Sequence, residues 1–218
     1  MKPDPSQITT THQPSNLILA SQSPRRRMLL TNAGYRFVVD SPDEAVEQAV
    51  PRIQNSADRD VGNVISYVAD VALAKAQFVA GRHASAVILA ADTVALCDKE
   101  VLGKAANRDA ARRMLKFLSG REHDVFTGVC LWHRPSDLHL VHVERTRLRM
   151  DKLTDVQIEE YLESNAWVGK AGAFGYQDGW DWLHVVDGSE SNVVGLPLER
   201  LPEMFAKLQA LVPSHSWS

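Results

Sequence analysis

This sequence has no excess of positive charge, almost no cysteine and no long apolar run, and each absence excludes a class of protein. Its 218 residues include 24 Lys and Arg against 27 Asp and Glu, giving a net charge of −3, so we expect no nucleic-acid partner. The two cysteines, Cys97 and Cys130, are too few for a disulfide scaffold and indicate a reducing compartment. No stretch reaches transmembrane length, and residues 1–16 lack the apolar core of a signal peptide. We therefore expect a cytoplasmic protein without a membrane partner.

The composition, with 44% hydrophobic and 23% charged residues, is ordinary for a globular protein. The polar stretch 1–16 contains prolines and is expected to be a disordered tail, and 213–218 is expected to be a loose C-terminal tail. The segment between them, 17–212, is long enough to bury the core of a single α/β domain.

Hydrophobic periodicity predicts strands and helices in alternation along this domain. Strands are expected at residues 17–20, 35–39, 87–96, 101–102, 125–132, 138–150 and 183–186. Helices are expected at 24–33, 61–80 and 198–211, from an Asn107 cap to 118, and from a Thr154 capping box to 162. The alternation is too irregular for a doubly wound parallel sheet, so it favours an α/β fold with a mixed central sheet flanked by helices.

Three consecutive arginines, Arg25, Arg26 and Arg27, occupy the first turn of the helix expected to begin at Pro24. The N-terminus of a helix already carries partial positive charge, so cations are unfavourable there unless an anion is bound. Backbone amides, the hydroxyl of Ser21 and the arginine side chains would then converge on phosphate oxygens. The alternative is a solvated basic turn. The three arginines follow a buried strand and a serine-rich turn, however, and this position favours the phosphate site.

Asp92 lies inside the most apolar segment of the chain, 87–96. A carboxylate is costly to bury there unless it is paired, hydrogen-bonded or bound to a metal. The alternative, that the strand ends at Asp92 and the side chain caps a turn, conflicts with the apolar residues 94–96 beyond it. The position therefore indicates that Asp92 holds a divalent cation or acts as a general base on water.

Two lysines and a glycine-rich loop are each weak indications of a ligand site, but their combination is a stronger one. Lys75 lies among small apolar residues of the helix expected at 61–80, where a lysine that snorkels to the surface is the commoner case. Lys104 follows a hairpin from which it could reach a phosphate. The loop 169–179 lets backbone approach a ligand closely, and Gln177 within it could pair with a base edge. With the arginines and the buried aspartate, these residues describe a charged cleft suited to a triphosphate and its metal.

Six segments in this order resemble the Maf family of nucleotide pyrophosphatases, namely LILASQSPRRRMLL, LAKA, ILAADTVAL, VLGKAANRDAARRMLKFLSGREHDVFTGV, VGKAGAFGYQ and SNVVGLPLERL. They extend from Leu17 to Leu201, which is most of the chain. The resemblance implies an elongated, two-lobed Maf/ITPase-like fold with a cleft between the lobes. It also implies a hydrolase that cleaves a nucleoside triphosphate between its α and β phosphates, releasing the monophosphate and pyrophosphate.

The resemblance also implies a role for individual residues. The aspartate of the Ala-Asp-Thr motif, which is the proton acceptor and lies at the metal site, matches Asp92. The phosphate-binding Ser-Pro-Arg-Arg segment matches Arg25 and Arg26, and the family lysines match Lys75 and Lys104. The metal-binding glutamate aligns with Glu44 or Glu47, of which we favour Glu47. The cofactor implied is a divalent cation, Mg²⁺ or Mn²⁺.

Three positions indicate the substrate. Relatives of the dTTP/UTP type have arginine after Ser-Pro, threonine after the aspartate and glutamine in the glycine-rich loop, as here at Arg25, Thr93 and Gln177. The 7-methyl-GTP type usually has tryptophan and glutamate at the first and last of these. The chain departs from the usual family pattern at two positions. Ala105 replaces the proline that usually follows Gly-Lys, and Asp178 replaces the glycine that usually follows the glutamine. The second change bears on the shape of the base pocket.

The expected function is thus hydrolysis of dTTP and UTP, with modified pyrimidine nucleotides as further candidate substrates. Two alternatives stay open, a 7-methyl-GTP pyrophosphatase and a non-enzymatic regulator of septum formation that only binds nucleotide. Turnover, measured separately from binding, distinguishes an enzyme from a sensor. A nucleoside triphosphate is the expected partner, and a homodimer is left open.

Overall fold

One mixed sheet of seven strands organises this computed structural model, which describes residues 13–51, 53, 60–213 and 217. The strand order is β2-β1-β3-β5-β6-β7, with β4 paired to β3. The strands are β1 (Leu17–Leu19), β2 (Val38–Val39), β3 (Val87–Cys97), β4 (Glu100–Leu102), β5 (Glu122–His133), β6 (Leu138–Met150) and β7 (Leu183–Asp187). Strand β1 runs parallel to β2 and β3, and the other pairs are antiparallel. The predicted mixed α/β fold is confirmed.

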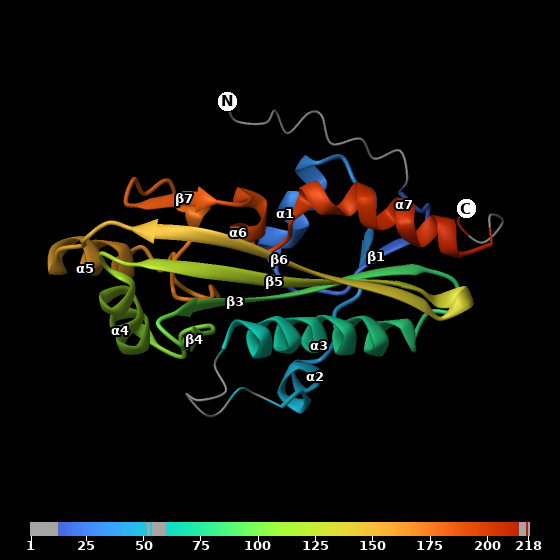
Figure 1. Cartoon of the computed structure of the whole chain (residues 1–218), viewed down its shortest axis with the longest axis horizontal. Helices are drawn as coiled ribbons and strands as arrows, with labels where there is room; N and C mark the ends of the chain where they lie inside the picture. Colours follow the sequence, from blue (N-terminus) through green and yellow to red (C-terminus); the bar gives the residue numbers. More distant parts are fainter. Residues whose placement is uncertain (1–12, 52, 54–59, 214–216, 218) are drawn as a thin grey trace.

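Helices cover both faces of this sheet, and Figure 1 shows α3 along one face and α1, α6 and α7 along the other. The helices are α1 (Pro24–Asn32), α2 (Glu44–Ala49), α3 (Val61–Ala80), α4 (Arg108–Leu118), α5 (Asp155–Glu163), α6 (Glu190–Val194) and α7 (Leu201–Leu211). Single 3-10 turns form η3 (Arg134–Ser136), η4 (Tyr176–Asp178) and η5 (Leu198–Arg200). Among the described residues, no helix combines the length and the apolar character needed to span a membrane.

Helix α3 forms where the sequence predicts it and packs unusually close to the sheet. The Asp60 side chain caps its first turn by accepting a hydrogen bond from the Asn63 amide at 2.8 Å. Its buried face includes Val64 and Val68, which pack on the sheet. A side chain at Gly128 of β5 would overlap the Val68 carbonyl, so glycine is required there for the close approach of helix and strand.

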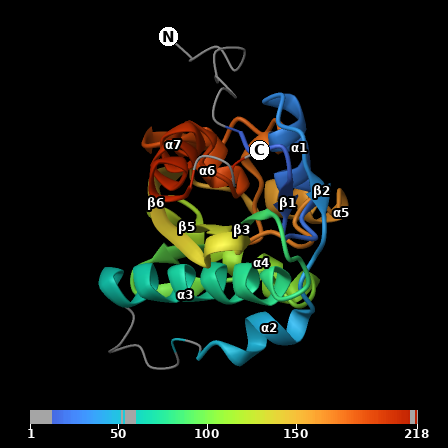
Figure 2. The same ribbon diagram turned by 90° about the vertical axis from the view of Figure 1, so that its right-hand side faces the viewer.

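The molecule is elongated (Figure 1). Two of its hydrophobic clusters join different sets of elements. One cluster joins α1, β1 and α7 through residues such as Leu30, Leu19 and Phe205. The other joins α4, α5 and the start of β5 through residues such as Leu115 and Tyr161. Seen along the long axis in Figure 2, α3 lies on one side of the sheet and α7 on the other, with α2 packed outside α3.

Parts of the expected tails make defined contacts. The Asn16 side chain donates to the Ser85 carbonyl at 3.1 Å, and the Asn16 carbonyl accepts from Val87 at 3.3 Å, which extends the pairing of β1 with β3. At the other end, Trp217 is buried and packs against Phe205 because a large aromatic ring gains from leaving water. The remaining tail positions, 1–12, 214–216 and 218, lie outside the described residues.

Candidate active site

The site lies where one edge of β3 has no neighbouring strand among the described residues. Strand β5 pairs with β3 from Val87 to Leu96 and occupies the other edge. On the open edge, β1 pairs with β3 only as far as Leu89, and the pairing of β3 with β4 begins only at Ala95. The gap at residues 90–94 holds Asp92 and Thr93. The chain leaving β1 reaches the gap from one side, and the chain leaving β4 reaches it from the other.

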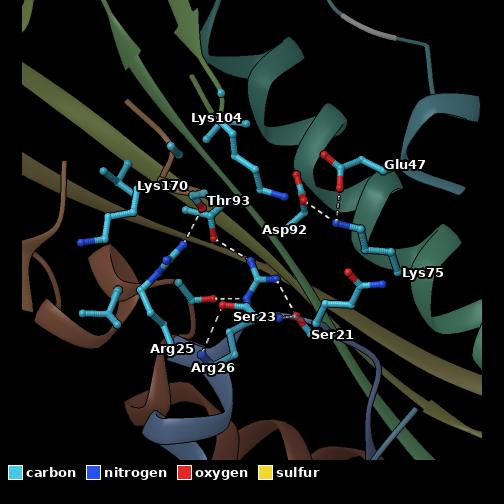
Figure 3. Close-up of a pocket in the computed structure, with 18 of the residues that line it drawn as sticks. Ser21, Ser23, Arg25, Arg26, Glu47, Lys75, Asp92, Thr93, Lys104 and Lys170 are labelled. Atoms are coloured by element: carbon cyan, nitrogen blue, oxygen red, sulfur yellow. Dashed lines mark hydrogen bonds and ion pairs between the residues drawn. The ribbon is translucent and has the colours of Figure 1, made fainter. Parts of the chain in front are cut away.

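A cleft of about 780 Å³ opens at this gap, within the range of roughly 300–1,000 Å³ typical of small-molecule sites. The structure brings together in its lining every residue that the sequence predicts for the site, namely Ser21, Arg25, Arg26, Glu47, Lys75, Asp92, Thr93, Lys104 and Gln177. The alternative glutamate, Glu44, lines the same cleft. These residues come from segments far apart in the chain, and Figure 3 shows most of them facing one space.

Lys75 links the two carboxylates predicted for metal binding. Its Nζ donates to Asp92 Oδ1 at 2.6 Å and lies 3.0 Å from Glu47 Oε2 (Figure 3). The side chain comes from the buried face of α3, so it does not snorkel to the surface. Glu47 makes this contact, whereas Glu44 is exposed and forms no ion pair with a described residue.

The same lysine affects the charge of the glutamate. Burial acts to raise the pKa of Glu47, but the charge and hydrogen bond of Lys75 and the charge of Lys104 outweigh it and lower the pKa below its usual value. Glu47 is therefore a carboxylate at neutral pH. Lys104 is exposed and forms no ion pair with a described residue, so its ammonium group is available to a ligand.

The Arg26 side chain hydrogen-bonds residues of three different segments around the site. Its Nε donates to the Gly195 carbonyl at 2.7 Å, Nη1 to Ser21 Oγ at 3.1 Å, and Nη2 to Thr93 Oγ1 at 3.0 Å (Figure 3). The Thr93 hydroxyl also bonds that of Thr127 at 2.9 Å. This network ties α1, β3 and the turn after α6 to one another.

The three arginines of the basic turn have separate environments. Arg25 lines the cleft and its Nη2 donates to the Gly169 carbonyl at 2.7 Å, joining α1 to the glycine-rich loop. Arg27 is exposed and lies outside the cleft lining. Ser23 caps α1 as predicted, accepting from the Arg26 amide at 3.4 Å, and the N-terminus of this helix faces the cleft. A helix N-terminus with adjacent cations is a suitable binding site for phosphate oxygens.

Sequence reasoning missed a second ion pair at the cleft. Lys170 lines the cleft and its Nζ donates to both carboxylate oxygens of Asp178, with Oδ1 at 2.5 Å. The available signals were that both residues lie in the glycine-rich loop 169–179 and that Asp178 departs from the usual pattern of the family. Asn192 was also missed. It is fully buried, its side chain donates to Thr146 Oγ1 at 3.0 Å, and its backbone carbonyl accepts from the Thr127 hydroxyl at 3.2 Å.

Asp92 and Glu47 suit a cation that shares its ligands with a substrate. Among the described residues, no group of three or more His, Cys, Asp or Glu side chains could hold a metal ion. Magnesium, however, is usually bound by one or two carboxylates together with water and substrate phosphates. The two carboxylates flanking Lys75 match that arrangement, whereas they do not form a cage that would hold an ion alone.

The mixed α/β sheet carries a cleft lined by cations and carboxylates, an arrangement that suits phosphate binding by an α/β protein. The sequence matches the model of the Maf-like protein family over residues 16–208. It is 51% identical to a dTTP/UTP pyrophosphatase of Rhodopirellula baltica, covering 90% of this chain and 83% of that protein. Proteins of the same description from Symbiobacterium thermophilum and Myxococcus xanthus are 42% and 41% identical, covering 88% and 84% of this chain and 93% and 87% of theirs. The chain belongs to the Maf family.

Proposed function

We propose that this protein is a nucleoside triphosphate pyrophosphatase that hydrolyses dTTP and UTP to the monophosphate and pyrophosphate. The activity of its relatives supports this assignment. The observation that carries it is that Asp92, at the open edge of β3, shares one cleft with the N-terminus of α1 and with Lys104. A carboxylate in that position serves hydrolysis, and the surrounding N–H groups serve phosphate binding.

The phosphate chain is bound by groups at the two sides of the gap. The first-turn amides of α1 and the guanidinium of Arg25 lie on the side of β1, and the exposed ammonium of Lys104 lies on the side of β4. Ser21 is largely buried and accepts from Arg26, so it contributes mainly through that contact. These donors would stabilise the charge of the departing pyrophosphate.

Asp92 is the proton acceptor in this proposal. Lys75 donates to Oδ1 and thereby orients the carboxylate, while the open edge of β3 leaves space for a water molecule. As water adds to phosphorus, the bond to the α–β bridging oxygen breaks and a proton passes to the carboxylate. A divalent cation, Mg²⁺ or Mn²⁺, held by Asp92 and Glu47 would neutralise charge on the phosphate oxygens.

Gln177 is the proposed reader of the base. It lines the cleft from η4, its side chain is exposed, and it forms no hydrogen bond with a described residue. Its amide offers both a donor and an acceptor, which complement the carbonyls and N–H of uracil or thymine. The 7-methyl-GTP type usually has glutamate at this position, which would offer acceptors only. The presence of Gln177 therefore favours a pyrimidine base over 7-methylguanine.

We place the enzyme in the cytoplasm. Cys97 and Cys130 are both free and buried, in keeping with a reducing compartment. Burial raises the pKa of Cys130 to about 12, so this side chain stays a protonated thiol and is inert at neutral pH.

A screen of nucleoside triphosphates, with separate assays for pyrophosphate and phosphate, tests the proposal. We expect pyrophosphate from dTTP and UTP at higher kcat/KM than from GTP, ATP or 7-methyl-GTP. A chelator should abolish this activity, and Mg²⁺ or Mn²⁺ should restore it. Tight nucleotide binding without turnover would instead support the sensor alternative.

A further inference from the structure

Asp178 is held on two sides within the glycine-rich loop. Its carboxylate accepts from Lys170 Nζ and, at 2.9 Å, from the hydroxyl of Tyr161 on α5. Tyr161 is itself buried, with edge contacts to Trp180 and Trp182 at ring-centroid distances of 5.5 and 5.4 Å. The carboxylate is thus anchored to a packed aromatic cluster rather than to mobile surface groups.

Gly175 lies directly against this ion pair. A side chain there would overlap both Lys170 Nζ and the carboxylate of Asp178. The backbone angle of Gly175, φ −135°, is accessible to any residue, so the glycine serves the close approach of the ion pair. The loop is therefore folded around the contact between Lys170 and Asp178.

The other neighbour of Gln177 is also tethered. The hydroxyl of Tyr176 donates to Glu190 Oε1 of α6 at 2.8 Å. Within η4, Tyr176 and Asp178 are therefore held, while Gln177 between them is exposed, lines the cleft and makes no hydrogen bond with a described residue. Tyr176 and Asp178 therefore fix the turn, and Gln177 is the residue of the turn that faces the cleft.

Asp178 also balances two cations. Arg25 donates to the carbonyl of Gly169, the residue that precedes Lys170, so the two positive side chains lie at the same part of the loop. Burial lowers the pKa of both cations, the charge of Asp178 opposes this shift in each, and the charge of Arg25 lowers the pKa of Lys170 further. Without the carboxylate, a buried ammonium would lose its partner and the loop would have to rearrange.

We propose that Asp178 is a positioning residue for base selection, which fixes η4 through Lys170 and Tyr161 so that Gln177 meets the base in one orientation. The inference rests on the proposed function, because it takes Gln177 as the residue that reads the base. Asp178 is not a contact residue in this account, and it acts only through its neighbour.

The test measures binding of two non-hydrolysable analogues, α,β-methylene-UTP and α,β-methylene-GTP, by calorimetry, and KM and kcat for UTP. We expect Asp178→Ala to reduce the UTP-to-GTP affinity ratio about tenfold and to change KM for UTP more than kcat. Asp178→Asn, which keeps an acceptor for Tyr161 but loses the charge, should have an intermediate effect. Asp181→Ala, an exposed aspartate three residues further along, is the matched control and should leave the ratio unchanged.

A double-mutant cycle shows whether the effect passes through Gln177. In a Gln177→Ala background, we expect Asp178→Ala to cause no further loss of selectivity. An additive loss, an unchanged ratio, or an equal loss of affinity for both analogues would overturn the inference. If Asp178→Ala fails to fold, Tyr161→Phe replaces it in the cycle, and the same outcomes apply.

Failure of this inference differs from failure of the proposed function. Wild-type protein that binds the UTP analogue selectively but releases no pyrophosphate from UTP would refute the proposed function. The double-mutant cycle would then still test the role of Asp178 in selective binding. Wild-type protein that releases pyrophosphate but binds both analogues equally would overturn the roles of Gln177 and Asp178 in base selection and leave the pyrophosphatase activity standing.

Discussion

The Nζ of Lys75 lies 2.6 Å from Oδ1 of Asp92, and each of the two side chains is 10% exposed. One comes from the buried face of α3 and the other from the middle of β3, so the packing of helix on sheet creates the contact. Breaking a buried pair is costly because the remaining charge is left without a partner. The contact therefore holds the proposed proton acceptor in place before substrate arrives.

Replacing the proposed proton acceptor should remove turnover while keeping the fold. Asp92→Asn retains the shape of the side chain and an oxygen that can accept from Lys75, but it cannot take a proton from water. Loss of a general base typically costs about 10²–10⁴-fold in rate, so we expect kcat with UTP to fall by that amount. Circular dichroism should stay unchanged. Near-normal turnover would exclude Asp92 as the base.

The glutamate beside Lys75 should make stability depend on pH in acid. The pKa of Glu47 is lowered from its ordinary value of 4.5 in the folded state, so its contribution is present above about pH 4.5 and is lost as the pH falls through the folded value. Because the side chain is 34% exposed, water screens the pair, and the effect should stay below about 1 kcal/mol. Urea unfolding between pH 3 and 6 should show a shallower acid loss for Glu47→Gln than for wild type. Glu44→Gln, the exposed control, should follow wild type, and identical slopes for all three would contradict the account.

Arg26 and Arg27 are adjacent but should differ sharply in their effect on stability. Three N–H groups of Arg26 bond Gly195, Ser21 and Thr93, and a lysine ammonium cannot reach all three. We expect Arg26→Lys to lower the free energy of unfolding by about 1–3 kcal/mol. Exposed Arg27→Lys should stay within about 0.5 kcal/mol of wild type in the same denaturation experiment. Equal effects would mean that the Arg26 network adds nothing to stability.

Base preference should move when both residues that mark the subtype are changed. The double change Arg25→Trp with Gln177→Glu removes a donor from the loop contact and makes the base reader acceptor-only. Losing a buried hydrogen-bond match costs about 1–3 kcal/mol, or roughly ten- to hundredfold in selectivity. The ratio of kcat/KM for UTP over 7-methyl-GTP should fall by that factor. Wild-type protein that prefers 7-methyl-GTP would contradict the dTTP/UTP assignment and not the pyrophosphatase assignment.

Long periodic elements could be predicted from sequence, and short polar ones could not. Helix α3 was predicted with its observed bounds, because apolar residues recur on one face over its whole length. Helix α2 was missed, since its six residues, EAVEQA, bury no side chain fully and carry no such pattern. Strand β5 begins at Glu122, earlier than predicted, because Asp124 is paired across the sheet with Arg145 and Arg147 instead of lying in an apolar run.

The same limit applies to the site. The unusual position of Asp92 within an apolar strand could be recognised from neighbouring residues alone. The division of labour among the arginines could not, because it depends on which carbonyls α1 meets across the fold. Asp178 stood out only as a departure from the pattern of the family, and its partners Lys170 and Tyr161 become visible once the loop is folded.

The identity of the products from UTP tests the central claim most directly. Phosphorus-31 NMR of wild-type protein incubated with UTP and Mg²⁺ distinguishes cleavage of the two anhydride bonds in a single spectrum. We predict that UMP and pyrophosphate form in equal amounts. UDP and inorganic phosphate should not form at a rate comparable to that of UMP and pyrophosphate. UDP and inorganic phosphate as the first products would contradict the proposal that Asp92 and the cations of this cleft direct hydrolysis to the α–β bond.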